Sequence, residues 1–302
     1  MSLSLAAQVS DRRPLCAGPD PKPRPPKFAL PAGAADCHAH ICGPADSYRY
    51  AESRIYTPPD ALVDDYTAML RTMGIERAVI VNPSVYGADN TVTLKALETP
   101  GFELRGVAVI DGDTVADDAL RRMDRAGVRG VRVNLVDVAD PSGGLPLDAV
   151  TRLARRVAPL GWHVEFLIHV DSMPGFDAVF ADFPTDIVLG HLGYMRPDRG
   201  PSEPGFRALL RLMKKGRCWV KLTGPYRITA GDKPYAGVTP TARALVEAAP
   251  DRLVWGSDWP HVMVTKPMPN DGDLCDLLLD WIPDEAVRKQ VLVDNPARLY
   301  GF

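Results

Sequence analysis

Short apolar segments recur along the chain at fairly regular intervals. Seven of them are runs rich in Val, Ile, Leu and Ala, and they cover residues 78–81, 104–110, 128–133, 164–168, 187–189, 218–222 and 253–255. An initial strand ending near His38 brings the number to eight. Strands that are apolar throughout, with no polar face, are typical of a parallel sheet that is buried on both sides.

Segments with helical periodicity lie between most of these runs. Apolar spacings of three and four residues predict helices over 61–72, 91–97, 115–126, 147–158, 205–214 and 239–248, and two final helices over 273–281 and 284–292. Eight strands alternating with helices predict an α/β fold of the closed (β/α)8, or TIM-like, barrel type. An open doubly wound sheet is the alternative, but the first strand is not followed by the GxGxxG turn of that fold.

The first 33 residues follow a different pattern, rich in proline and basic residues. Residues 20–27 read Asp-Pro-Lys-Pro-Arg-Pro-Pro-Lys, and such a composition does not build a packed core. We therefore predict an extended arm over residues 1–33 and a single barrel domain over residues 34–302. We expect the arm to lie on the barrel or on a neighbouring subunit, and the second case would make the protein a homo-oligomer.

Composition and charge narrow the class of protein. The 302 residues are 46% hydrophobic and 24% charged, with a formal net charge of −3, the balance of an ordinary globular protein. Lys and Arg form no block, and no apolar stretch has the ~20 residues of a membrane helix, so neither nucleic acid nor a membrane is an expected partner. The five scattered cysteines favour free thiols, and the N-terminus has no signal-peptide pattern, so we predict a cytoplasmic protein.

Barrel enzymes carry their catalytic residues at the C-terminal ends of the strands, and this chain has polar residues there. His38 and His40 end the first strand and point the same way, because positions i and i+2 of an extended segment share a side. His191 follows the sixth strand, and Asp258 follows the eighth. The histidines suit metal ligation or stabilisation of an oxyanion, and Asp258 suits a general base or a metal ligand. The alternatives are a surface loop with two unrelated histidines for His38 and His40, a hydrogen-bonded structural residue for His191 and a helix cap for Asp258.

Basic residues occupy strands that are otherwise apolar. Arg132 lies in the fourth strand, and Lys221 and Arg227 flank the end of the seventh. A cation inside a barrel is costly unless it is paired. These side chains are therefore buried ion-pair partners or anchors for an acidic substrate, since a guanidinium binds a carboxylate in a bidentate fashion. His169 follows the fifth strand and could add a metal ligand.

Taken together, these motifs resemble the amidohydrolase superfamily. The similarity lies in HxH at 38–40, Gly-His-Leu-Gly at 190–193, Gly-Ser-Asp-Trp-Pro-His at 256–261 and Asp-Asn-Pro-Ala-Arg-Leu-Tyr-Gly at 294–301. Within the superfamily the chain resembles the branch that opens pyrone dicarboxylates and sulfomuconolactones, over roughly residues 31–302. The resemblance implies a (β/α)8 barrel and hydrolysis of a lactone C–O bond by water that Asp258 activates.

The resemblance also implies a set of substrate-binding residues. Positions that match those holding the dicarboxylate in the pyrone lactonases are Tyr56, Ser84, Arg132 and Arg227. Positions that depart from the branch are Tyr86, Val138 and Tyr194, in place of one His and two Arg. Fewer arginines favour a substrate with one acidic group, or one with an aromatic or hydroxylated part. The complete expected set is Tyr56, Ser84, Tyr86, Arg132, Lys221, Arg227 and His261.

Members of this branch work with a single zinc or without a metal. We expect one divalent cation, zinc, with His38, His40, Asp258 and His169 as its ligands. In the metal-free alternative the histidines polarise the substrate carbonyl themselves.

We therefore predict a hydrolase that opens a small acidic lactone in the catabolism of aromatic or sugar acids. The expected catalytic residues are Asp258, His191, His38 and His40. One rival is a metal-dependent, non-oxidative decarboxylase of the same superfamily, which His169 as a strand-5 ligand supports. Another is a non-catalytic barrel that only binds an acidic metabolite, and the joint presence of the two-histidine motif, His191 and Asp258 argues against it.

Overall fold

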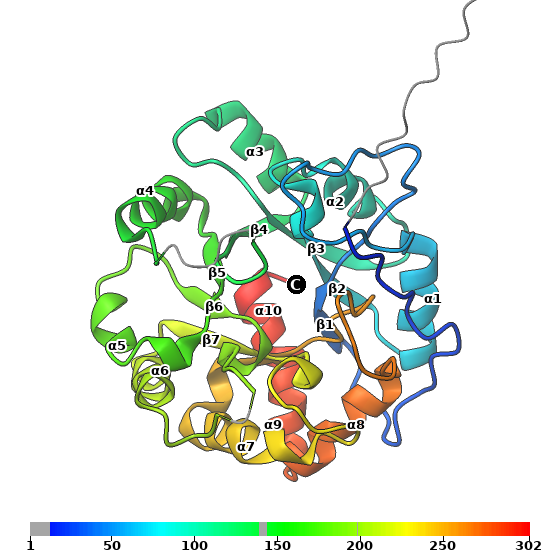
Figure 1. Ribbon diagram of the computed structural model, residues 1–302, viewed down its shortest axis with the longest axis vertical. Helices are drawn as coiled ribbons and strands as arrows, with labels where there is room; N and C mark the ends of the chain where they lie inside the picture. Colours follow the sequence, from blue (N-terminus) through cyan, green and yellow to red (C-terminus); the bar gives the residue numbers. More distant parts are fainter. Residues whose placement is uncertain (1–12, 139–143, 198) are drawn as a thin grey trace, which may run out of the picture.

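The computed structural model describes residues 13–138, 144–197 and 199–302. All neighbouring strands pair in parallel in one sheet, in the order β1 to β8, and helices surround this sheet (Figure 1). The strands are β1 (Ala35–Ala39), β2 (Arg77–Val81), β3 (Glu103–Ala108), β4 (Val128–Asn134), β5 (His163–Leu167), β6 (Ile187–Leu189), β7 (Cys218–Leu222) and β8 (Leu253–Trp255). The predicted (β/α)8 barrel is confirmed.

The barrel closes where the segment after β8 meets β1. The main-chain N–H of Asp258 donates to the carbonyl of His38 at 2.8 Å, and the N–H of His40 donates to the carbonyl of Trp259 at 2.8 Å. We call this contact the β1–β8 seam. Two of the predicted catalytic residues, His38 and Asp258, are therefore joined through their backbones.

Asp36 stabilises the seam through hydrogen bonds to Ser257 and to Tyr66 of the first helix. Its carboxylate accepts hydrogen bonds from the N–H of Ser257 at 2.9 Å, from the Ser257 hydroxyl at 2.5 Å and from the Tyr66 hydroxyl at 2.9 Å. Burial raises the pKa of Asp36 to about 6, although these hydrogen bonds act in the opposite direction. Asp36, two residues before His38, is thus structural.

The inside of the barrel is filled by small and branched side chains from the strands, by Trp219 of β7 and by one aromatic ring from the C-terminal helix. The interior cluster consists of Ala35, Cys37, Val79, Val81, Val107, Val188, Trp219, Val254 and Tyr300. Tyr300 ends α10, which lies across the centre of the barrel in Figure 1. This packed interior lies beneath the C-terminal ends of the strands and rigidly supports the polar residues there.

The helices begin and end close to the predicted positions. They are α1 (Val63–Met73), α2 (Thr91–Ala96), α3 (Asp117–Arg125), α4 (Leu147–Val157), α5 (Phe176–Val179), α6 (Pro204–Lys214), α7 (Thr239–Ala248), α8 (Asp271–Trp281), α9 (Glu285–Lys289) and α10 (Asn295–Tyr300). The sequence pattern did not predict α5 or α10. The four residues of α5 are too few to show a periodicity, and α10 follows α9 and a π-helical turn without a break. Among the described helices, none combines the length and the hydropathy needed to cross a bilayer.

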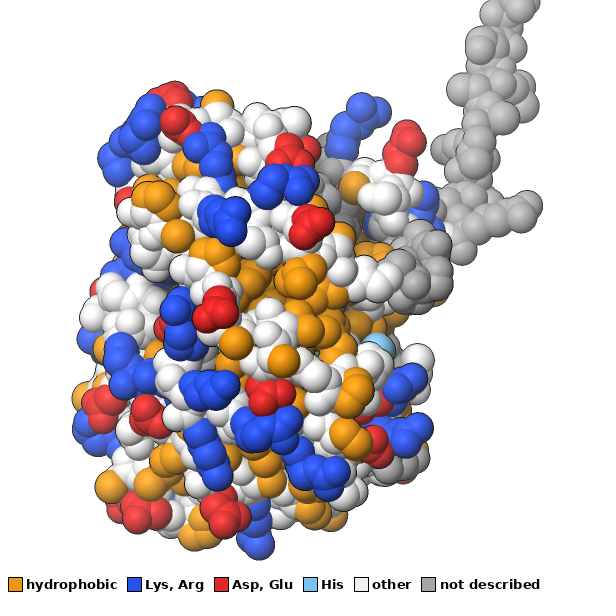
Figure 2. Space-filling model, turned by 90° about the vertical axis from the view of Figure 1, so that its left-hand side faces the viewer, with side chains coloured by type: hydrophobic (Ala, Val, Ile, Leu, Met, Phe, Trp, Pro, Cys, Tyr) orange, Lys and Arg blue, Asp and Glu red, His pale blue; other side chains and the backbone are white. Residues whose placement is uncertain are grey.

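Residues 13–33, the described part of the arm, pack on the barrel of the same chain. Near its start the N–H of Cys16 donates to the carbonyl of Thr57 at 2.9 Å. Farther along, Arg24 forms ion pairs with Asp273 and Asp276 of α8. Contact with a neighbouring subunit stays a prediction. On the face shown in Figure 2, basic and acidic side chains are interspersed.

Candidate active site

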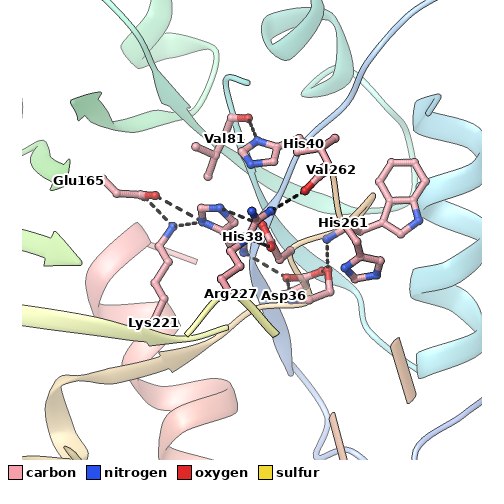
Figure 3. Close-up of polar contacts among 12 residues, drawn as sticks. Asp36, His38, His40, Val81, Glu165, Lys221, Arg227, His261 and Val262 are labelled. Atoms are coloured by element: carbon pink, nitrogen blue, oxygen red, sulfur yellow. Dashed lines mark hydrogen bonds and ion pairs between the residues drawn. The ribbon is translucent and has the colours of Figure 1, made fainter. Parts of the chain in front are cut away.

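His38, at the end of β1, is held by charged residues from two other strands (Figure 3). Its Nδ1 lies 3.1 Å from Nζ of Lys221 in β7 and 3.4 Å from Oε1 of Glu165 in β5. Lys221 and Glu165 also contact each other at 2.6 Å, and all three side chains are at most 2% exposed. The ion pair compensates both buried charges and fixes the imidazole from below.

The same neighbours set the protonation of this group. Burial and the Lys221 ammonium both lower the pKa of His38, which keeps the imidazole neutral near pH 7. Burial alone would raise the pKa of Glu165, but Lys221 and His38 outweigh it and hold that pKa well below the usual range.

His40 and His191 complete a group of three imidazoles. The Nδ1–H of His40 donates to the carbonyl of Val81 at 2.8 Å, which leaves Nε2 with a lone pair. Nδ1 of His191 is buried and has no hydrogen-bond partner among the described residues. Burial lowers the pKa of both rings well below the ordinary value, so both are neutral at physiological pH.

Asp258 presents its two carboxylate oxygens to different surroundings. Oδ2 accepts hydrogen bonds from the Tyr226 hydroxyl at 2.6 Å and from Nε of Arg227 at 2.7 Å. Oδ1 is buried, lies 3.6 Å from Nε2 of His38 and has no hydrogen-bond partner within the described ranges. Burial alone would raise the pKa of Asp258, but Arg227 and the nearby histidines hold it well below the usual range. Asp258 is thus a carboxylate with one free oxygen.

Three buried donor atoms converge at this point. One ligand atom each from His38, His191 and Asp258 lies within 4.8 Å of the other two. Each of these residues has one buried atom without a hydrogen-bond partner in the part of the chain that the structure describes, namely Nε2 of His38, Nδ1 of His191 and Oδ1 of Asp258. Unsatisfied buried polar atoms are costly, so such a group is expected to bind something. Two imidazoles and one carboxylate fit a divalent cation that keeps an open coordination position.

The loops that carry these ligands have an unusual backbone. Six residues other than glycine adopt positive φ angles between 46° and 66° in the segments after β6 and β8, namely His191, Leu192, Tyr194, Asp258, His261 and Met263. Each such residue costs of order 1 kcal/mol and persists only where the surroundings impose it. A Cβ at Gly224 would lie 2.6 Å from Nδ1 of His191, so the segment after β7 also requires a glycine there. Backbone strain and close packing are therefore concentrated around His38, His191 and Asp258, which we call the three-ligand cluster.

Two of the expected substrate-binding residues, Arg132 and Tyr56, have polar groups with few or no hydrogen-bond partners among the described residues. Arg132 is only 7% exposed, and it makes neither a hydrogen bond nor an ion pair with the residues that the structure describes. Tyr56 is buried, and its hydroxyl shares a hydrogen bond with Ser84. An unpaired guanidinium in such a place is suited to an anionic ligand.

Other expected site residues are engaged elsewhere. Lys221 is completely buried beneath His38, and the Tyr86 hydroxyl accepts a hydrogen bond from the N–H of Gly43 at 2.8 Å. His169, an expected metal ligand, has Nδ1 2.7 Å from the carbonyl of Tyr194 and its ring stacked on that tyrosine. In the three-ligand cluster of the described residues, His191 takes the place expected for His40 and His169.

The sequence analysis missed three residues that support the site. Glu165 lies in an apolar strand, as Lys221 does. Its charge in such a strand is a signal that sequence analysis could have used, because a buried acid, like a buried cation, needs a partner. Tyr226 contacts Asp258, and Asp271 at the start of α8 lies 3.1 Å from Nε2 of His261. These two carry no sequence signal, since their role depends on contacts between distant segments.

Comparison with known proteins agrees with this geometry. The pattern of the amidohydrolase family matches residues 35–302. The chain is 37% identical to a 4-sulfomuconolactone hydrolase of Hydrogenophaga intermedia, over 98% of each chain. It is also 37% identical to a 2-pyrone-4,6-dicarboxylate hydrolase of Comamonas testosteroni, over 92% of this chain and 93% of the other. A crystal structure from Agrobacterium tumefaciens superposes with a TM-score of 0.80 at 28% identity, covering 92% of this chain and 98% of that one. This chain belongs to the amidohydrolase family.

Proposed function

We propose that the protein is a hydrolase that opens the ring of a small lactone bearing an acidic group, in the catabolism of aromatic or sugar acids. The observation that carries the proposal is the asymmetry of Asp258, whose Oδ2 holds two hydrogen bonds while the buried Oδ1 has none among the described residues. A carboxylate in this state suits a general base for water. The two relatives of similar length act on lactones, as their names state.

The mechanism follows from the placement of the groups. The acidic group of the substrate binds Arg132, which fixes the lactone carbonyl beside His38, His40 and His191. A water molecule attacks the carbonyl carbon while Asp258 takes its proton, and the histidines stabilise the oxyanion that forms. The ring C–O bond then breaks, and Asp258 returns the proton to the departing oxygen. The product is the open-chain hydroxy acid or its keto tautomer.

We further propose that His38, His191 and Asp258 hold one divalent cation, and that it is zinc, which two imidazoles and a carboxylate favour. Such a cation would supply Lewis-acid polarisation of the carbonyl and a lowered pKa for bound water. Without a cation, His38 carries its proton on Nε2 and donates it toward the carbonyl, and Nδ1 accepts a hydrogen bond from Lys221. Elemental analysis of the purified protein, with turnover measured before and after chelation, separates the two forms.

The decisive test is Asp258→Asn, assayed on 4-sulfomuconolactone and 2-pyrone-4,6-dicarboxylate. Loss of the base should lower kcat roughly 10²- to 10⁴-fold, with an unchanged circular dichroism spectrum. Asp118→Asn, which alters an exposed ion pair on α3, serves as the matched control and should keep full activity. Near-normal turnover in Asp258→Asn would refute the proposal.

The same assay addresses the rivals. A decarboxylase would release carbon dioxide from an acidic substrate, and a non-catalytic barrel would bind the lactones without turnover. His169 supported the decarboxylase, but its contact with Tyr194 gives that alternative no new support. All five cysteines are free, four of them buried, which supports our proposal that the enzyme works in the cytoplasm.

A further inference from the structure

A line of buried polar side chains runs from Asp258 to the first turn of α8. The Tyr226 hydroxyl lies 2.6 Å from Oδ2 of Asp258 and 3.0 Å from Nδ1 of His261. Nε2 of His261 lies 3.1 Å from Oδ1 of Asp271. Tyr226 is 6% exposed and the other three are at most 1% exposed, so bulk water does not replace these contacts.

The direction of the hydrogen bonds follows from the chemistry of the groups. The Asp258 carboxylate can only accept, so Tyr226 donates its single proton to Oδ2. The tyrosine oxygen then accepts from the Nδ1–H of His261. On the far side of the ring, Oδ1 of Asp271 can accept a hydrogen bond from Nε2 where that nitrogen also carries a proton. Three separate segments of the chain are linked in this way.

This line fixes the orientation of the Asp258 carboxylate and therefore the direction of its free oxygen. A rotation of the carboxylate out of this orientation would break the hydrogen bonds from Tyr226 and Arg227, both to a charged acceptor. The backbone does not favour the observed conformation by itself, since Asp258 and His261 have positive φ angles of 66° and 61°. The side-chain contacts therefore hold a loop that the local sequence would not hold.

We propose that Tyr226, His261 and Asp271 are positioning residues that keep Oδ1 of Asp258 turned toward the reacting water. This inference rests on the proposed function, in which Asp258 is the base. It also gives His261 a role different from the substrate contact expected from sequence, because its ring is fully buried and both nitrogens are engaged.

Tyr226→Phe tests the proposal, with Tyr235→Phe as its matched control. The Tyr235 ring lies 6.1 Å from that of Tyr226, and its buried hydroxyl has no hydrogen-bond partner among the described residues. A hydrogen bond to a charged group is worth about 1.5–3 kcal/mol, so Tyr226→Phe should lower kcat on 4-sulfomuconolactone by roughly 10- to 100-fold. KM should change less than about twofold, because the binding of the acidic group is untouched. Tyr235→Phe should change neither constant.

A second readout separates positioning of the base from a general structural effect. Hydroxylamine attacks lactones without needing a base, so its reaction on the enzyme should be slowed much less by Tyr226→Phe than hydrolysis is. An equal loss with both nucleophiles, or no loss in kcat, would overturn the inference. If Tyr226→Phe does not fold, Asp271→Asn carries the same comparison from the other end of the line, with a smaller expected loss.

Asp258→Asn, measured in parallel, tests the proposed function separately from the positioning role of Tyr226. If Asp258→Asn is inactive and Tyr226→Phe behaves like the unaltered enzyme, the positioning role fails and the proposed function stands. If Asp258→Asn keeps full turnover, both fail.

Discussion

Arg132 lies in β4, is only 7% exposed as a residue and makes no hydrogen bond or ion pair with any described residue. Other buried cations of the site are compensated, since Lys221 contacts Glu165 and Arg227 contacts Asp258. An isolated buried charge is costly, and proteins retain one where a ligand supplies the opposite charge. Because Arg132 acts electrostatically on His40 and His191, we propose that the acidic group of the lactone is that ligand.

Replacing Arg132 by methionine should therefore raise KM for 4-sulfomuconolactone by roughly 10- to 100-fold, the effect of losing one charged hydrogen-bonding partner, and leave kcat within a few-fold. Steady-state kinetics measures both constants. An uncharged lactone such as δ-valerolactone should show no such difference between the two proteins.

Arg129→Met is the control from the same strand, because Arg129 donates to the main chain of Asp124 and Val128 away from the site. Equal KM values for Arg132→Met and the unaltered enzyme would remove Arg132 from the substrate-binding set.

For individual residues, the sequence predicted which side chains lie at the site better than it predicted their roles. His38, His191 and Asp258 could be located because the ends of parallel strands meet at one end of a barrel. The roles of Lys221 and His261 could not, since each depends on one particular side-chain contact that a pattern does not specify, with Glu165 in one case and Asp271 in the other. A strand pattern shows that a polar side chain is buried but not what it contacts.

Among the elements, the start of α8 connects the arm to the barrel. Asn270 caps this helix by accepting from the N–H of Gly272 at 3.2 Å, and it also accepts from the N–H of Arg24 at 3.1 Å. Its amide donates to Asp20 and to the carbonyl of Lys22, both at 2.9 Å. One side chain thus joins a helix cap to the attachment of the arm.

Asn270→Ala should accordingly destabilise the protein by about 2–3 kcal/mol, because an N-cap contributes about 1 kcal/mol and the buried contacts to the arm add to it. Urea unfolding measures the loss, and limited proteolysis should show faster cleavage within residues 13–33. Asp284→Ala, which removes a cap of α9 without arm contacts, should cost only about 1 kcal/mol. The hypothesis fails if the two variants lose equal stability and the arm stays protected.

The elements themselves were largely predictable. Apolar strands and amphipathic helices of ten or so residues carry enough positions to define a period, which explains the agreement for α4 and α7. The connection between β5 and β6 carries no such pattern, and the short α5 within it is fixed by packing of Phe176 and Phe180.

For the molecule as a whole, buried neutral histidines link stability to pH. His163, at the start of β5, is 3% exposed, and burial lowers its pKa to about 3. In the unfolded chain the same group titrates near 6.5. Its contribution to stability is therefore fully present above pH 6.5, and it is lost progressively as the pH falls toward 3, since only the unfolded chain binds the proton.

His163→Leu removes this linkage without touching the active site. Between pH 7 and pH 5 the variant should lose about 2 kcal/mol less unfolding free energy than the unaltered protein. Urea titrations at the two pH values provide the comparison. Identical pH dependence in both proteins would mean that His163 is not held neutral in the fold.

The β1–β8 seam also has a consequence for the chain during its synthesis on the ribosome. The ribosome synthesises His38 early and Asp258 late, and the seam can join them only after all eight strands have been synthesised. The cluster of His38, His191 and Asp258 therefore cannot assemble before residue 258 is made. If Asp258 is the base, as we propose, a chain truncated before this residue has no hydrolytic activity, so the cell acquires the enzyme only near the end of its synthesis.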